Sequence, residues 1–315
     1  MAYLAWFGYM FWQSQWNLFE ENWYITLTMI FGSFVAGVSS EGGGAIAYPV
    51  LTLAFDISAS SARNFSLAIQ SVGMIAAALW IIANRINIEF NYLKVAAIGG
   101  TPGIIIGTYY LVPHIPDSYA KLVFVSFWLS FGIALFVINH VKKRMTVTEL
   151  DVLPIKDIAA LLFVSFFGGL LTAIFGSGLD ICTFAYITLR YNLSEKVATP
   201  TSVVLMASNA LVGFLLHAFI INDIQPQTFN YWLVSIPVVL IGAPIGAYTA
   251  VKIKRILLCA LLYLVIVVQF VAALVIIPLS ATKIIIVGCT FTAGLMLFFV
   301  ISRGDRLLER LHKLS

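Results

Sequence analysis

Charged residues are scarce in this sequence: Asp, Glu, Lys and Arg make up 10% of its 315 residues. Hydrophobic residues account for 61%, and the mean hydropathy is +0.99. Soluble globular domains carry roughly 25% charged residues. The composition therefore excludes a soluble globule and indicates a chain whose solvent is lipid. We predict an all-α membrane protein that crosses the cytoplasmic membrane several times.

Several kinds of chemistry lack the residues that they need. The three cysteines, Cys182, Cys259 and Cys289, lie in apolar runs, so neither a disulfide framework nor a metal cluster is expected. The four histidines lie in or beside loops without metal-ligand spacing, and no nucleotide-binding motif is present. With no paired catalytic His and no nucleophile beside a base, an enzyme is not expected. We expect no cofactor, no bound metal and no nucleic-acid partner.

The two ends of the sequence differ in charge. Residues 1–19 contain no Lys or Arg and eight aromatic residues, so they lack the basic region of a signal peptide. We interpret residues 1–23 as an aromatic interfacial segment. Residues 302–315 alternate charged residues with leucine, which is typical of an amphipathic helix. We predict that this tail is cytoplasmic.

What the sequence does contain is a series of long apolar runs, two of which are unusual. Most runs are about 20–25 residues, enough for one helical crossing. Residues 24–55 and 157–189 are longer, and each is interrupted near its middle by glycines. Such a length suits neither one crossing nor two. We predict a broken helix or a re-entrant hairpin in each. Three transmembrane helices follow each hairpin, giving repeats 24–140 and 157–277, a linker 141–156 and a final helix 278–301.

The two unusual runs resemble each other at an offset of 136 residues. The residues paired at this offset are Gly32 with Gly168, Gly42 with Gly178, Ser58 with Ser194, Ala62 with Ala198 and Ser66 with Ser202. The later segment Gly100-Thr101-Pro102-Gly103 resembles Gly242-Ala243-Pro244. The chain is therefore predicted to be an internal duplication, which in membrane proteins is typical of transporters with a site near mid-membrane.

The distribution of Lys and Arg predicts how the repeats are oriented. If both interrupted runs cross the membrane, the eighteen basic residues divide 11 to 7 between the two sides. If both are re-entrant, fifteen lie inside and only Arg63, Lys121 and Lys283 lie outside. The positive-inside rule favours the second arrangement. Three crossings then separate the hairpins, so the repeats have inverted topology and the C-terminus is cytoplasmic.

The interrupted runs also predict a binding site. A helix that starts inside the membrane offers unpaired N–H groups and the positive end of its dipole, so an anion is its natural ligand. Polar residues on the following helices could complete the site, and the alternative is that serine and water cap two plain helix breaks. The predicted substrate-binding residues are Ser39, Ser40, Gly42, Gly43, Gly44, Asn64, Ser66, Gln70, Gly176, Ser177, Gly178, Thr201, Ser202 and Asn209.

Three further features allow more than one interpretation. Glu41 and Asp180 are the acidic residues nearest the breaks, and each could either carry a coupled proton or cap local N–H groups. Arg63 could attract anions at the outer mouth, but we expect it to snorkel towards water. Glycine and proline at 99–103 and 242–244 indicate hinges or close packing, of which we expect packing.

The order of these motifs resembles the TauE/SafE sulfite-exporter family of membrane permeases. The resemblance runs from about Tyr24 to Ile301 and depends on a block that occurs twice. In the first half it comprises Gly37, Gly42-Gly43-Gly44, Pro49, Ala62 to Leu67, Gly100 to Gly103 and Gly107; in the second half it comprises Gly168-Gly169, Gly176 to Gly178, Ala198 to Val203 and Gly242 to Gly246. The family commonly has a threonine where this chain has Phe65, while Thr201 keeps it in the second half. The resemblance implies transport of sulfite, organosulfonates or related sulfur oxyanions.

Two functions follow from the sequence. The first is a secondary transporter of a small sulfur-containing anion, exporter or importer, that works by alternating access between inverted repeats. Because no nucleotide-binding motif is present, an ion gradient, such as a proton gradient, or the substrate gradient must drive it. The second is an uncoupled anion channel that uses the same site. The substrate, the direction of transport and the formation of a homo-oligomer stay open.

Overall fold

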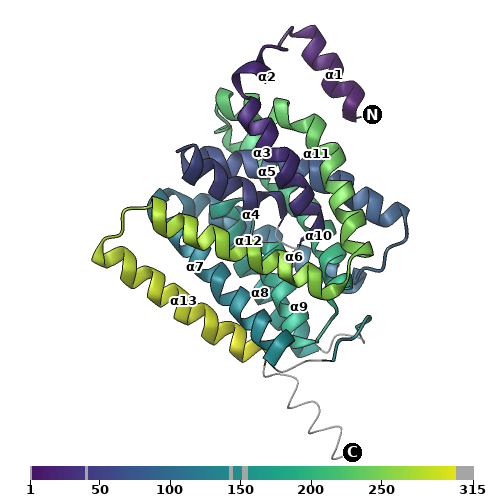
Figure 1. The fold of residues 1–315 in the computed structure, drawn as a ribbon, viewed down its shortest axis with the longest axis vertical. Coiled ribbons are helices and arrows are strands. Elements are labelled where there is room, and N and C mark those ends of the chain that lie inside the picture. Colours follow the sequence, from purple (N-terminus) through teal and green to yellow (C-terminus); the bar gives the residue numbers. More distant parts are fainter. Residues whose placement is uncertain (1, 40–41, 142–144, 151–154, 303–315) are drawn as a thin grey trace, which may run out of the picture.

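The protein is a bundle of helices (Figure 1). A computed structural model describes residues 2–39, 42–141, 145–150 and 155–302, apart from the side chains of residues 42–45, 117 and 118. Within these residues every regular secondary-structure element is a helix, and a single isolated β-bridge joins Val147 to Leu193. Eight of the helices are long and apolar enough to cross a membrane. The protein is therefore an all-helical, multi-pass membrane protein.

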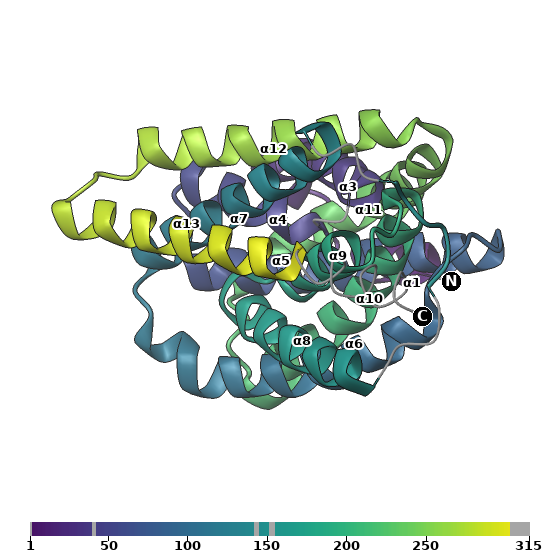
Figure 2. The ribbon, with the colours of Figure 1, turned by 90° about the horizontal axis from the view of Figure 1, so that it is seen from below.

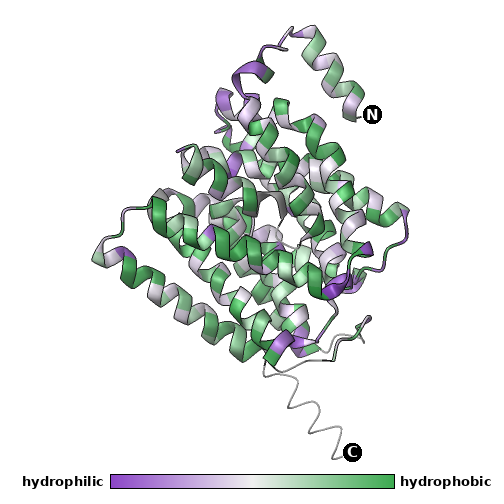
Figure 3. Ribbon diagram, in the orientation of Figure 1, coloured by the Kyte–Doolittle hydropathy of each residue, from purple (hydrophilic) through white to green (hydrophobic). Residues whose placement is uncertain are grey.

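The described residues form a series of helices in chain order. Their bounds are α1 (Ala2–Trp12), α2 (Leu18–Glu21), α3 (Trp23–Val38), α4 (Gly42–Pro49), α5 (Ala59–Ala83), α6 (Phe90–Ile106), α7 (Asp117–Phe136), α8 (Ile155–Phe175), α9 (Leu179–Arg190), α10 (Glu195–Leu215), α11 (Pro226–Lys252), α12 (Arg255–Ile276) and α13 (Ala281–Ser302). Short turns η1 (Val50–Ala54), η2 (Gly107–Leu111), η3 (Val112–His114), η4 (Val137–Val141) and η5 (Leu216–Ile221) extend several of them. In Figure 3 the helices are mostly hydrophobic, and hydrophilic residues gather at α2 and at the turns.

The first interrupted run folds back on itself. Gly32 in α3 lies beside the Ile46 side chain of α4, since a Cβ added to Gly32 would lie 3.6 Å from Ile46 Cγ2. At the other end of the pair, the rings of Tyr24 and Phe55 lie 4.8 Å apart between their centroids. The start of α3 and the end of η1 therefore meet, so that residues 24–55 form a hairpin.

The second interrupted run folds in the same way. Gly168 in α8 faces Cys182 in α9, and these two residues correspond to Gly32 and Ile46 at the offset of 136. Asp157 near the start of α8 accepts a hydrogen bond from Arg190 at the end of α9, with 3.1 Å between Oδ1 and Nη2. The two ends of residues 157–190 therefore also meet on one side.

Each hairpin packs against a helix of the other half through small residues. In the crossing of α3 with α11, a Cβ on Gly242 would overlap the Ser33 hydroxyl. In the crossing of α8 with α6, a Cβ on Gly169 would overlap the Gly100 carbonyl oxygen. Ser33 corresponds to Gly169 and Gly242 to Gly100, so the two crossings are reciprocal. The glycines serve close helix packing, as expected from the sequence.

Helix α13 lies on the outside of the bundle beside α7, as Figures 1 and 2 show. Its Phe298 packs against Phe127 and Phe131, with 5.1 and 5.5 Å between ring centroids. It covers a groove between α7 and the second hairpin. The matching groove between α12 and the first hairpin, a cavity of about 360 Å³ lined by Val35, Ile46 and Gln269 among others, has no such helix against it in the described part of the chain.

The N-terminal helix α1 compensates for a proline in α11. Pro237 has no N–H, so the carbonyl oxygen of Leu233, four residues earlier, loses its helical partner. The indole of Trp6 donates to this oxygen at 2.8 Å, and the hydroxyl of Tyr3 donates to the Pro237 carbonyl. Because an unpaired carbonyl is costly in lipid, α1 helps to keep α11 continuous.

Glu89 lies half-buried in the turn before α6 and accepts a hydrogen bond from the Leu150 N–H at 2.9 Å. Burial raises the pKa of Glu89, the nearby Glu149 charge adds to this, and the Leu150 N–H opposes it. A raised folded-state pKa means that stability falls as pH rises through it. We expect Glu89→Gln to raise the thermal unfolding midpoint at pH 8. The two unfolding midpoints, of Glu89→Gln and of the wild type, are compared across a pH series. If the gap between them does not shrink towards pH 4, the prediction is contradicted.

Candidate functional site

The second break is a three-residue turn between α8 and α9. Gly176 has a φ of 76°, in the left-handed region that favours glycine. A Cβ there would also meet the Ser66 side chain and the Arg63 carbonyl of α5. Helix α5 therefore lies directly against the break, and only glycine allows this approach.

Two side chains of α5 satisfy the end of α8. The Gly176 carbonyl oxygen accepts hydrogen bonds from Gln70 Nε2 at 2.9 Å and from Ser66 Oγ at 3.3 Å. Both residues are buried, and Gln70 Nε2 also donates to Ser66 Oγ at 2.8 Å. The sequence-predicted residues Ser66, Gln70 and Gly176 are thus in direct contact.

The start of α9 is capped by a carboxylate of its own chain. Asp180 is fully buried, and its Oδ1 accepts from the Gly178 N–H at 2.9 Å. The Ser177 hydroxyl lies 3.4 Å from both carboxylate oxygens, and the Leu179 N–H donates to Thr172 Oγ1 at 2.9 Å. The position that the sequence assigns to an anion is therefore bounded by a carboxyl group of the protein itself.

Helix α10 completes the surroundings of this break. Ser202 Oγ donates to the Asp180 carbonyl oxygen at 3.3 Å, and Asn209 Nδ2 donates to Thr172 Oγ1 at 3.3 Å. Within the described residues, Gln70 Oε1 and Asn209 Oδ1 are buried without a hydrogen-bond partner. Each amide oxygen can accept from water or from the hydroxyl of a protonated ligand. The second break thus combines hydroxyl donors with two open acceptors.

The first break is described in part. Ser39 directly follows α3 and is buried beside a small cavity of about 10 Å³, lined also by Thr199, Glu195 and Cys259, which has room for about one water molecule. Gly42, Gly43 and Gly44 begin α4. Ser40 and Glu41 lie outside the described residues, so their predicted roles stay predictions.

Each break lies against the helix that follows the other hairpin, that is, α10 or α5. Ser39 of the first shares its cavity with Thr199 of α10, and Gly176 of the second meets Arg63 of α5. Arg63 and Thr199 correspond at the offset of 136. This reciprocal arrangement brings both breaks to the centre of the bundle, where α5 and α10 pack together.

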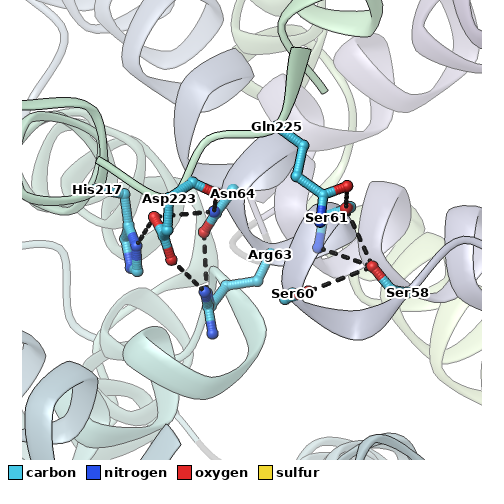
Figure 4. A network of polar contacts seen from close by, with 8 residues as sticks. All are labelled: Ser58, Ser60, Ser61, Arg63, Asn64, His217, Asp223 and Gln225. Carbon is cyan, nitrogen blue, oxygen red and sulfur yellow. Dashed lines mark hydrogen bonds and ion pairs between the residues drawn. The ribbon is translucent and has the colours of Figure 1, made fainter. Parts of the chain in front are cut away.

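Two predicted site residues form their hydrogen bonds elsewhere. Thr201 Oγ1 donates to the Val197 carbonyl and accepts from the Glu89 N–H, so it ties α10 to the turn before α6. Asn64 contacts Asp223 in the loop before α11 (Figure 4). These two side chains therefore bond to the turn before α6 and to the loop before α11, and not to the turn at Gly176.

The expectation for Arg63 was wrong. Arg63 does not snorkel: it is 4% exposed and pairs with Asp223, with 3.4 Å between Nη2 and Oδ2. His217, to which the sequence assigned no role, is 1% exposed and lies 2.8 Å from Asp223 through Nδ1. A buried arginine needs a counter-charge. Here the counter-charge comes from a residue 160 positions away in the sequence.

Sequence reasoning missed Thr172 and Glu195. Thr172 is the one polar residue between Gly169 and Gly176, and that isolation within an apolar run was its only signal. Glu195 is buried at the start of α10, where Asn139 and Arg255 donate to its carboxylate at 2.9 and 3.0 Å. Its signal was an acidic residue directly after the helix-capping Ser194.

Comparison with known proteins gives one family. The model of the family described as sulfite exporter TauE/SafE matches residues 25–273, which include both hairpins and both breaks. No curated protein and no solved structure gives a significant match. In the described residues, no group of three His, Cys, Asp or Glu side chains could hold a metal ion.

Proposed function

Since the chain belongs to the sulfite exporter TauE/SafE family, we propose that it is a secondary transporter of a small sulfur-containing anion such as sulfite or an organosulfonate. The observation that carries this proposal is the second break, where donors from α5, α9 and α10 gather around the start of a helix. Backbone N–H groups and hydroxyls at such a start are suited to an oxyanion.

We propose further that the two repeats have inverted topology and that both hairpins are re-entrant. The contacts Tyr24–Phe55 and Asp157–Arg190, which join the ends of each hairpin, support the re-entrant arrangement. The reciprocal crossings through Gly242 and Gly169 support a two-fold relation between the halves, because in a two-fold contact each partner uses the same surface. With the Lys and Arg distribution, this orientation gives a cytoplasmic C-terminus.

In this mechanism, the halves rock around the two breaks and expose them to each side in turn. The anion approaches the N–H groups of Gly178 and Leu179 together with the hydroxyls of Ser66, Ser177 and Ser202. Asp180 must then share those donors or release them. Glu41 and Asp180 are the two candidates for a proton-coupled carboxylate, and of the two only Asp180 lies within the described residues, where it caps α9.

Transport can be tested with Gln70→Leu in proteoliposomes. This change removes one of the two side chains that donate to the Gly176 carbonyl, so we expect sulfite transport to fall by about tenfold or more in kcat/KM. Gln269→Leu is the matched control. Gln269 is also a buried glutamine of a helix, but it lines the groove between α12 and the first hairpin, away from the second break. Equal effects of the two changes would contradict the site.

The same vesicles distinguish a transporter from an anion channel. A coupled transporter accumulates sulfite against its gradient when an ion gradient is imposed, whereas a channel only dissipates the sulfite gradient. We expect accumulation. Sulfite flux that never exceeds equilibration would favour the channel.

A further inference from the structure

The polar network at the start of α5 has an uneven distribution of exposure. Arg63, Asn64 and His217 are 4%, 2% and 1% exposed and belong to α5 and η5. Their common partner is Asp223, in the short loop between η5 and α11, and its side chain is 36% exposed. The donors are therefore fixed in the bundle, whereas the acceptor is carried by a surface loop.

All three donors converge on one carboxylate. His217 Nδ1 lies 2.8 Å and Asn64 Nδ2 lies 3.2 Å from Asp223 Oδ1, while Arg63 Nη2 lies 3.4 Å from Oδ2. Figure 4 shows Asp223 between His217 on one side and Asn64 and Arg63 on the other. A guanidinium, an amide and an imidazole around two oxygens are the groups that recognise any small oxyanion.

A second observation indicates that Asp223 does not use the whole capacity of this cluster. His217 Nε2 is buried and has no hydrogen-bond partner among the described residues. The cluster also adjoins the second break, because the Arg63 carbonyl and the Ser66 side chain both lie at the Gly176 position. Arg63 and Ser66 are three residues apart, about one turn of helix. The helix position that carries Arg63 is thus about one turn from the part of α5 that contacts the proposed site.

We propose that Arg63, Asn64 and His217 form an outer binding site for the substrate oxyanion, and that Asp223 occupies this site as an internal substitute until the anion displaces it. The proposal rests on the transport function proposed above and names residues that the anion meets on the outer side of the proposed site. Exchange of one negative group for another keeps the buried Arg63 paired throughout, so its desolvated charge is never left alone. A neutral or cationic solute cannot make this exchange, which gives selection for anions.

The ionisation of Asp223 fits this exchange. Burial alone would raise the pKa of Asp223, but the hydrogen bond and charge of His217 and the charge of Arg63 outweigh it, and the pKa is lowered. Asp223 is therefore ionised at neutral pH. Its release on anion binding would free the loop between η5 and α11, at the junction of two helices of the second repeat.

The test is Asp223→Asn in the full-length protein, with sulfite and methanesulfonate binding measured by calorimetry in detergent. Asparagine keeps the shape and the hydrogen-bonding oxygen but removes the competing charge, so we expect both anions to bind about tenfold more tightly. Arg63→Gln should weaken binding by about tenfold or more, and the double variant should resemble Arg63→Gln. Asp157→Asn, in the separate pair with Arg190, should leave binding unchanged.

The outcomes separate this site from the transport function. Unchanged or weaker binding in Asp223→Asn overturns the outer site, even if wild-type vesicles transport sulfite. Tighter binding in Asp223→Asn with no transport by any variant supports the outer site and overturns the transporter. If Arg63→Gln does not fold, Arg63→Lys, which keeps the charge but loses the planar fork, should show intermediate affinity.

Discussion

Replacing Gly37 by leucine is expected to abolish the folded protein. A Cβ on Gly37 would overlap the Ala243 carbonyl oxygen and approach the Ala247 N–H, both backbone atoms of α11. Backbone cannot yield as a side chain can, and in lipid the contact between helices depends on this close approach. Since Gly246 of α11 lies equally close to Phe34 and Gly37 of α3, no neighbouring space can take up the leucine.

The measurement is the yield of monodisperse protein on size-exclusion chromatography after membrane extraction. Gly288→Leu is the control, because a Cβ on Gly288 of α13 meets nothing within 4 Å. We expect near-normal yield for Gly288→Leu and almost none for Gly37→Leu. Comparable yields of the two variants would show that α3 and α11 do not touch at this crossing.

Removing the Asp180 carboxylate should have the second-largest effect. In Asp180→Ala the buried Gly178 N–H loses its acceptor at 2.9 Å, and the Ser177 hydroxyl loses both carboxylate oxygens at 3.4 Å. An unsatisfied buried donor costs about 1–3 kcal/mol. Because this cost falls on the break itself, we expect transport of sulfite into proteoliposomes to drop by at least about tenfold.

Asp180→Asn separates capping from proton transfer. The asparagine oxygen can still accept from the Gly178 N–H, but the side chain can no longer gain and lose a proton. If Asp180 acts as a cap, as its contacts with the break indicate, Asp180→Asn keeps most of the transport activity and the same pH profile. Persistent transport with a flattened pH profile would instead identify Asp180 as the proton carrier.

The duplicated pattern predicted a large part of the fold. Repetition at a fixed offset carries contact information, because equivalent residues in duplicated units make equivalent contacts. Gly32 with Ile46 and Gly168 with Cys182 are one such pair. The same pattern identified the second break and its partners Ser66 and Gln70, and the family membership agrees with the resemblance noted from the motifs.

The residues that the sequence did not predict depend on contacts between distant segments. Asp223 lies in a polar loop and has no local feature that connects it with Arg63, so the sequence pattern assigned the arginine to water instead. Thr201 satisfied the repeat pattern but bonds the turn before α6, because its hydroxyl lies towards Glu89. Helical spacing shows which residues share one face of a helix. It does not show which neighbouring element that face contacts.

Among the described residues, α13 lies against one of the two matching grooves and no helix lies against the other, which has a consequence for the energetics of the proposed rocking. If the two halves were identical, a two-fold rotation would convert the outward-facing shape into the inward-facing shape, and the two shapes would have equal free energy in a symmetric bilayer. Helix α13 packs over one groove only, through Phe298 against Phe127 and Phe131, so the two shapes no longer have equal free energy. If the halves rock as proposed, we therefore expect the protein to prefer one of its two shapes before any solute or gradient acts on it.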